Sequence, residues 1–228
     1  MATNTIDFGK IYETTNFGNG VDDNTIDWGK VYKDLGGDEV ETKFVFSVQT
    51  DNSGTSNDDQ FTLPLTTSTD LDITVEWGDG NSDSISDHTA SEVTHTYASA
   101  GEYTIKIDGT LRGFKFDNGG DKLKIKDVSN WGVIQFDVDS IFRGCRNLTC
   151  SATDVVTAIA GNISKVFFDC RNFNGAIGNW DVSSATNMSE MFFDAQSFNQ
   201  DLNSWDVSGV TNMQQMFRNA LSTSNLIT

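Results

Sequence analysis

Proline, cysteine, histidine and basic residues are all scarce in this 228-residue chain, which has one proline, three cysteines, two histidines and 15 Lys and Arg residues. A single proline excludes a proline-rich linker or stalk. Three cysteines make a poor disulfide framework, and the sequence contains no CxxC pair that would indicate a metal site. Because the sequence also lacks an HExxH, GxSxG or P-loop motif, it offers no catalytic signature, and we expect a protein that is not an enzyme.

The shortage of positive charge limits the partners that the chain can bind. Its 33 acidic residues give a formal net charge of -18. Nucleic-acid binding and docking on anionic lipid both need Lys and Arg, so we expect neither nucleic acid nor a membrane as a partner. No apolar run is long enough to span a bilayer. Residues 1–15 have no basic or apolar region typical of a secretory signal, so we expect a chain that is not exported by that route.

The C-terminal half carries a 25-residue repeat. Residues 173–197 and 198–222 are identical at 13 of 25 positions, and weaker copies precede them. A fixed period of this length predicts stacked coils, in which equivalent residues form ladders that share one core. The predicted ladders are Phe142, Phe167, Phe192 and Phe217; Trp180 and Trp205; and Met188 and Met213.

The wording of the repeat carries a resemblance. The stretch "FNQDLNSWDVSGVTNMQQMF" at 198–217 resembles the repeats of BspA-like leucine-rich-repeat surface proteins, and "DKLKIKDVSNWG" at 121–132 is similar to the entry of those arrays. The resemblance implies a leucine-rich-repeat-type solenoid and an adhesive, cell-surface role. Residues 150–165 lack the Trp-Asp-Val of the later coils, and the array is short, so we expect a compact head instead of a long arm.

The middle segment alternates polar and apolar residues between turn-forming residues, which is typical of antiparallel strands. In it, "VEWGDG" at 75–80 and "HTYASAGEYTIKI" at 95–107 resemble polycystic-kidney-disease (PKD) domains, which are small immunoglobulin-like β-sandwiches. The resemblance implies a spacer or binding module, with Trp77 and Tyr97 in the core. It also implies a structural role for His95.

The N-terminal segment repeats a shorter motif, because "NTIDFGKIY" at 4–12 recurs as "NTIDWGKVY" at 24–32. About 40 polar residues cannot bury a core of their own. An unstructured tail is one interpretation, and an extended arm with two equivalent aromatic hooks is the other, which the duplication favours. We expect such an arm to dock on other chains of a larger assembly, and equivalent hooks also suit a homo-oligomer. The predicted docking residues are Phe8, Tyr12, Trp28 and Tyr32.

Three further features each have a structural interpretation and an alternative as a metal site or a disulfide. The acidic turns at 51–59 and 77–87 offer oxygen donors to calcium but do not match an EF-hand, so we expect solvated turns and no cofactor, with calcium as the alternative. Cys145 and Cys170 share one ladder position; we expect small buried thiols, with a disulfide as the alternative. The repeated Asp181 and Asp206 suit turn hydrogen bonds better than a metal ladder.

Together these patterns predict a mainly β protein. It would have an extended docking arm over 1–41, an immunoglobulin/PKD-like β-sandwich over 42–111, and a leucine-rich-repeat-type solenoid of about four coils over 112–228. The expected function is a structural or recognition protein on the surface of a bacteriophage virion, displaying a binding head toward a host surface protein or glycan. A bacterial cell-surface adhesin is the alternative. A glycan-active enzyme is the remote one, because it would need two carboxylates about 5–10 Å apart in a cleft.

Overall fold

A computed structural model describes residues 41–67, 69–156 and 159–220. From Thr42 onward these residues belong to one compact unit, Thr42–Thr228. The predicted docking residues Phe8, Tyr12, Trp28 and Tyr32 lie outside the described residues.

The unit is mainly β, as the sequence predicts, and in the described part of the chain its only helix is the short 3-10 turn η1 (Ser91–Val93). That part contains no helix long and apolar enough to cross a membrane. The strands are β1 (Phe44–Gln49), β2 (Gln60–Thr62), β3 (Asp72–Glu76), β4 (Ser82–Ile85), β5 (Thr94–Thr96), β6 (Glu102–Thr110), β7 (Ile125–Asn130), β8 (Thr149–Cys150), β9 (Gly161–Asn162) and β10 (Ala185–Asn187).

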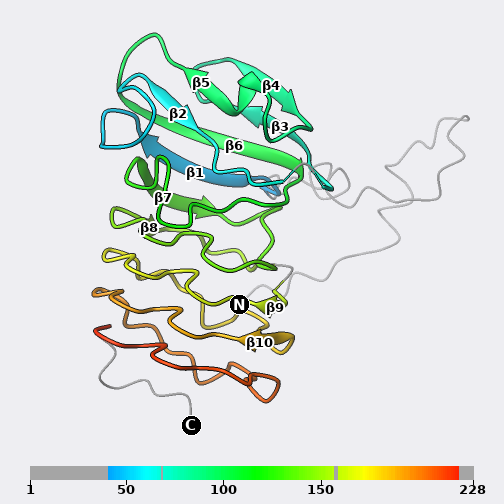
Figure 1. The fold of residues 1–228 in the computed structure, drawn as a ribbon, viewed down its shortest axis with the longest axis vertical. Coiled ribbons are helices and arrows are strands. Elements are labelled where there is room, and N and C mark those ends of the chain that lie inside the picture. The colour runs from blue at the N-terminus through cyan, green and yellow to red at the C-terminus, as the bar shows by residue number, and fades with distance from the viewer. Residues whose placement is uncertain (1–40, 68, 157–158, 221–228) are drawn as a thin grey trace, which may run out of the picture. The chain divides into compact units, whose positions relative to one another are not determined.

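Six of the strands form one sheet in the order β4-β3-β6-β1-β7-β8 (Figure 1). The strand β3 shows why the sequence folds this way: its residues alternate exposed and buried, with Ile73 and Val75 facing the core. The antiparallel pair β2–β5 packs over the sheet, where Phe61 of β2 lies 6.0 Å from Phe46 of β1 between ring centroids. The alternating polar and apolar residues of the middle segment therefore form antiparallel strands, and the β2–β5 pair covers one face of their sheet.

The strand β7 connects this sheet to the coils that follow. It pairs antiparallel with β1 on one side and parallel with β8 on the other. The remaining pair, β9–β10, is parallel as well. The expected boundary between residues 111 and 112 falls just after β6, and the sheet continues across it through β7, so one hydrophobic core runs from Phe44 to Met216.

The coils are held together by main-chain hydrogen bonds at a regular offset. The N–H groups of Phe142, Phe167 and Phe192 each donate to a carbonyl 24 residues later, and all three distances are 2.9 Å. The turns that make this possible place equivalent residues in the left-handed region, with φ of 56° at both Asp169 and Asp194. Aspartate, asparagine and glycine tolerate that region best, so the residue types at this position match the backbone they must adopt.

The phenylalanine positions form a continuous stack of nearly parallel rings. Ring centroids are 5.8 Å apart for Phe142 and Phe167, 5.7 Å for Phe167 and Phe192, and 5.5 Å for Phe192 and Phe217. The first three rings are fully buried and Phe217, in the last described coil, is partly buried. Met188 and Met213 show the same difference between an inner coil and the last one.

The two tryptophans of the repeat sit beside this stack. Each packs against the phenylalanine 13 residues before it, Trp180 with Phe167 at 6.2 Å and Trp205 with Phe192 at 6.4 Å between ring centroids. The indole N–H of Trp205 donates to the carbonyl of Ile177 at 3.1 Å. Among the described residues the indole N–H of Trp180 is buried without such a partner, so the two tryptophans share their ring packing but not their polar contacts.

Candidate functional site

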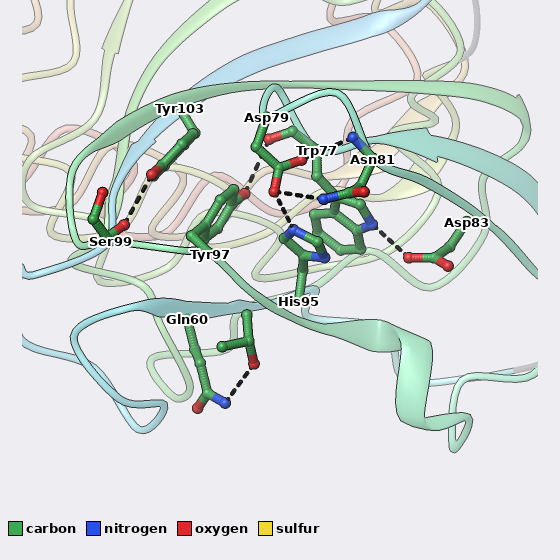
Figure 2. Close-up of polar contacts among 10 residues, drawn as sticks. Gln60, Trp77, Asp79, Asn81, Asp83, His95, Tyr97, Ser99 and Tyr103 are labelled. Carbon is green, nitrogen blue, oxygen red and sulfur yellow. Dashed lines mark hydrogen bonds and ion pairs between the residues drawn. The ribbon is translucent and has the colours of Figure 1, made fainter.

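His95 lies in a cluster of aromatic and acidic side chains beside the sheet (Figure 2). Its Nε2 is 2.8 Å from Oδ2 of Asp79, and its ring stacks on Trp77 with centroids 4.8 Å apart and planes 7° apart. The edge of the His95 ring meets Tyr97, which stacks in turn on Tyr103 at 3.8 Å. The motifs at 75–80 and 95–107, which β4 and η1 separate in the sequence, come together here.

The hydrogen bonds of this cluster tie down its polar groups. The indole N–H of Trp77 donates to Asp83 at 2.7 Å, and the Tyr97 hydroxyl donates to the carbonyl of Trp77 at 3.1 Å. Burial raises the pKa of Asp79, but the hydrogen bonds from His95 and Asn81 outweigh it and hold this pKa below its ordinary value. Burial also raises the pKa of the Tyr97 hydroxyl.

His95 and Asp79 are arranged like two of the three members of a catalytic triad. A triad needs a hydroxyl or thiol nucleophile within hydrogen-bond reach of the imidazole. The neighbours of His95 in the described structure are a carboxylate and the rings of Trp77 and Tyr97, and the Tyr97 hydroxyl is committed to a carbonyl. The cluster is therefore built to fix the turn at 78–81 against β5.

A second cluster contains two charged side chains that are almost completely buried, Asp121 and Lys124. The Asp121 carboxylate accepts hydrogen bonds from the main-chain N–H groups of Thr55, Ser56 and Thr62, at 2.8, 3.0 and 2.8 Å. It also accepts the Ser56 hydroxyl at 2.6 Å. These donors leave neither oxygen of the buried carboxylate without a hydrogen-bond partner.

The Lys124 ammonium holds the same loop from the other side. It donates to the carbonyls of Asn57 and Gln60, at 2.7 and 2.9 Å, and to the Ser56 hydroxyl at 2.8 Å. A calcium ion in this loop would need such oxygens as ligands. The acidic turn at 51–59, where calcium is the alternative expectation, thus has carbonyl oxygens occupied by the protein's own cation.

Across the described residues, no group of three or more His, Cys, Asp and Glu side chains is placed to hold a metal ion. The second acidic turn, 77–87, uses its carboxylates internally. Asp79 binds His95 and Asn81, and Asp83 binds Trp77. Both turns are therefore held together by protein hydrogen bonds.

The three cysteines are free thiols. Cys145 and Cys170 are fully buried in neighbouring coils, and the Cys170 thiol donates to the carbonyl of Phe142 at 3.0 Å. Burial raises the pKa of both thiols, and it raises the pKa of Cys150 to about 12. Of the two alternatives left open by the sequence, the structure has the small buried thiols.

The repeated aspartates cap turns, in line with the expectation from their position after tryptophan. Oδ1 of Asp181 accepts the N–H of Ser183 at 3.1 Å and its hydroxyl at 2.7 Å, and Oδ1 of Asp206 accepts the N–H of Ser208 at 3.0 Å. The Ser183 hydrogen bonds lower the pKa of Asp181.

A row of partly exposed aromatic rings runs along the turns of the coils. Phe168 and Phe193 stack with centroids 4.6 Å apart. The Arg143 guanidinium covers the outer face of Phe168 at 5.4 Å, and Arg218 covers that of Phe193 at 5.3 Å. Because arginine covers the outer face of each ring, the row stabilises the coils by cation–π contacts and offers no open ring face to a ligand.

Sequence reasoning missed Asp121 and Lys124. Lys124 stands between Lys122 and Lys126 in an alternating "KLKIK" stretch, where all three lysines look alike. The loop that buries Lys124 is more than 60 residues away in the sequence. No local signal could have separated this lysine from its neighbours.

Comparison with known proteins gives one family. A model of the family described as "Mycoplasma protein of unknown function, DUF285" matches residues 116–228, the segment that contains the coils. Neither the curated proteins nor the solved structures contain a match to this chain.

Proposed function

We propose that the chain is a non-catalytic structural and recognition protein on the surface of a bacteriophage virion. In this proposal the sheet of residues 42–111 serves as a PKD-like spacer and the coils form a leucine-rich-repeat-type head. The N-terminal arm, through Phe8, Tyr12, Trp28 and Tyr32, docks on other protein chains of the particle.

The observation that carries the proposal is that the histidine, carboxylate, lysine and thiol groups suited to catalysis are engaged in structural contacts. His95, Asp79, Asp121, Lys124 and the buried thiols all make contacts that hold turns or coils together. In the described coils, exposed positions such as Asn174, Ser183 and Ser208 are polar, which suits binding without turnover. The duplicated hook motif supports attachment to an assembly that presents equivalent sockets.

A cell-surface adhesin is the second candidate, and the family match favours it. The family is described from Mycoplasma, a cellular organism, and the match covers the coils. Both candidates bind without turnover, so they differ in location.

The experiment that separates them is mass spectrometry of purified phage particles beside washed cell envelopes from the same culture. The virion proposal expects peptides of the chain in particles at a constant ratio to the major capsid protein. Detection in envelopes alone would replace it with the adhesin. Incubation with host glycans, followed by product analysis, tests the non-catalytic part, which fails if glycan is cleaved and the cleavage is lost on mutation of a carboxylate pair.

A further inference from the structure

A small pocket of about 280 Å³ opens between the loop at 53–55 and the loop at 118–123. Its polar lining comes from Ser53, Thr55, Asn118 and Lys122, and its apolar lining includes Gly119 and Leu123. Clefts for drug-sized ligands measure roughly 300–1,000 Å³. This pocket is therefore sized for one small group.

The wall of the pocket is rigid although it consists of loops. Thr55 and Ser56 donate their main-chain N–H groups to the buried Asp121, and Lys124 binds the carbonyls of Asn57 and Gln60. Thr55 is thus held in place before a ligand arrives, and its hydroxyl lies 3.4 Å from Oδ1 of Asp121. A preorganised site loses less entropy on binding than a mobile one.

The charge at the pocket favours an anion. The Lys122 ammonium donates to the carbonyl and the side-chain oxygen of Asn118, both at 2.6 Å, and an ammonium has three protons, so one remains for a ligand. The nearby Asp121 carboxylate is turned to the 55–56 loop. Residues 112–171 hold nine Lys and Arg against seven Asp and Glu, although the whole chain carries -18.

We propose that this pocket binds a single sugar residue that carries an acidic group, either a carboxylate or a phosphate. Lys122 pairs with the acidic group, while Ser53, Thr55 and Asn118 exchange hydrogen bonds with the sugar hydroxyls. A charge-assisted hydrogen bond supplies affinity, and the hydroxyl contacts supply the preference for a sugar. The biological meaning of this site rests on the recognition role proposed above, whereas its chemistry does not.

The test is calorimetric titration of the full chain with four probes: glucuronate, glucose 6-phosphate, glucose and inorganic phosphate. One or both acidic sugars should bind, and which of them binds identifies the acidic group. Glucose and inorganic phosphate should each bind about tenfold more weakly, because each lacks one half of the recognised chemistry.

Three variants locate the binding. Lys122→Met should weaken the acidic sugar about tenfold or more, and Lys122→Arg should keep most of the affinity. Lys126→Met is the matched control, since Lys126 forms a surface ion pair with Glu102 and lies outside the pocket. Gly119→Leu should occlude the pocket without disturbing the fold, because a Cβ there would meet its nearest neighbour, the Phe116 carbonyl, at an ordinary 3.4 Å.

The proposal is overturned if neither acidic sugar binds, if glucose or inorganic phosphate binds as tightly as the acidic sugar that binds, or if folded Lys122→Met and Gly119→Leu bind that sugar like the unmodified chain. Circular dichroism of each variant establishes that it is folded. None of these results changes whether the chain is found in particles, so failure of the pocket and failure of the virion role are distinguishable.

Discussion

The ring of Phe192 lies between those of Phe167 and Phe217, with planes 12° and 5° apart, and it also stacks on Phe198 with centroids 4.0 Å apart. Removing this ring leaves a cavity that touches three coils. We expect Phe192→Ala to lower the free energy of unfolding by about 3–5 kcal/mol, as for other buried phenylalanines. Thermal and urea unfolding measure the loss.

The control for this prediction is Phe217→Ala at the equivalent position of the last described coil. Phe217 is only partly buried, so its removal should cost clearly less than that of Phe192. Coincident melting curves for Phe192→Ala and the unmodified chain would show that the stack does not stabilise the coils.

The stack also shows what the sequence could predict. A strict 25-residue period fixes which residues are equivalent, and like residues in stacked coils must lie over one another, so Phe142, Phe167, Phe192 and Phe217 could be placed without a structure. The period also makes Asp169 and Asp194 equivalent, but their shared left-handed φ of 56° was not predicted and comes from the structure. The stacked positions are predictable because the physics that sets them acts between neighbouring coils.

Contacts between distant parts of the chain could not be predicted from the sequence. The pairing of β7 with β1 joins segments about 80 residues apart, and alternation within β7 does not say which strand it meets. The burial of Lys124 depends on a loop that closes over it from residues 56–60. Both relationships require the tertiary fold, which a single sequence does not display.

Lys124→Met should be strongly destabilising. The substitution keeps the length of the side chain but removes the ammonium hydrogen bonds to the carbonyls of Asn57 and Gln60, which then keep only the Gln60 N–H and the Ser56 hydroxyl as donors among the described residues. A hydrogen bond to a charged group contributes about 1.5–3 kcal/mol. Urea denaturation should show the loss, and hydrogen exchange should show faster exchange of the Thr55 and Ser56 amides.

Lys126→Met supplies the comparison, because the Lys126–Glu102 ion pair is on the surface and is worth about 0–1 kcal/mol. Equal stability of the Lys124 and Lys126 variants would mean that the ammonium of Lys124 does not hold the loop.

Removing calcium should change little. Lys124 occupies carbonyl oxygens of the 51–59 turn, and the carboxylates of the 77–87 turn are engaged by His95, Asn81 and Trp77. We expect EDTA to shift the melting temperature by less than a few degrees. A large drop that excess calcium reverses would reveal a real site, because a ligand that binds only the folded state stabilises it by mass action.

Acid should weaken the His95 cluster. The pKa of Asp79 in the folded chain lies below its ordinary value of 3.8, so ionised Asp79 stabilises the fold above that value. This contribution is lost as the pH falls through the lowered pKa. Between pH 5 and strongly acidic solution, Asp79→Asn should therefore lose less stability than the unmodified chain. Parallel pH dependences for the two proteins would exclude a role for this carboxylate.

The thiols should be inert while the chain is folded. Burial raises the pKa of Cys145, Cys150 and Cys170, and only the thiolate reacts readily. A thiol-specific chromogenic reagent should label the native protein slowly and all three cysteines at once in urea. Fast labelling in native buffer would place at least one thiol at the surface.

Deletion of residues 1–40 tests the docking arm. Residues 42–228 form a compact unit with their own core, so the truncated chain should stay folded and soluble, with an unchanged circular dichroism spectrum. It should no longer co-sediment with the particles or envelopes that contain the full chain, because it lacks the aromatic hooks proposed to dock on the assembly. A double Phe8→Ala, Trp28→Ala variant of the full chain should lose most of the attachment, while either single variant should retain part of it through the remaining hook.

If the truncated chain co-sediments as well as the full chain, the anchor lies within 42–228. If it fails to fold, the arm belongs to the core, and a docking role would need evidence of another kind.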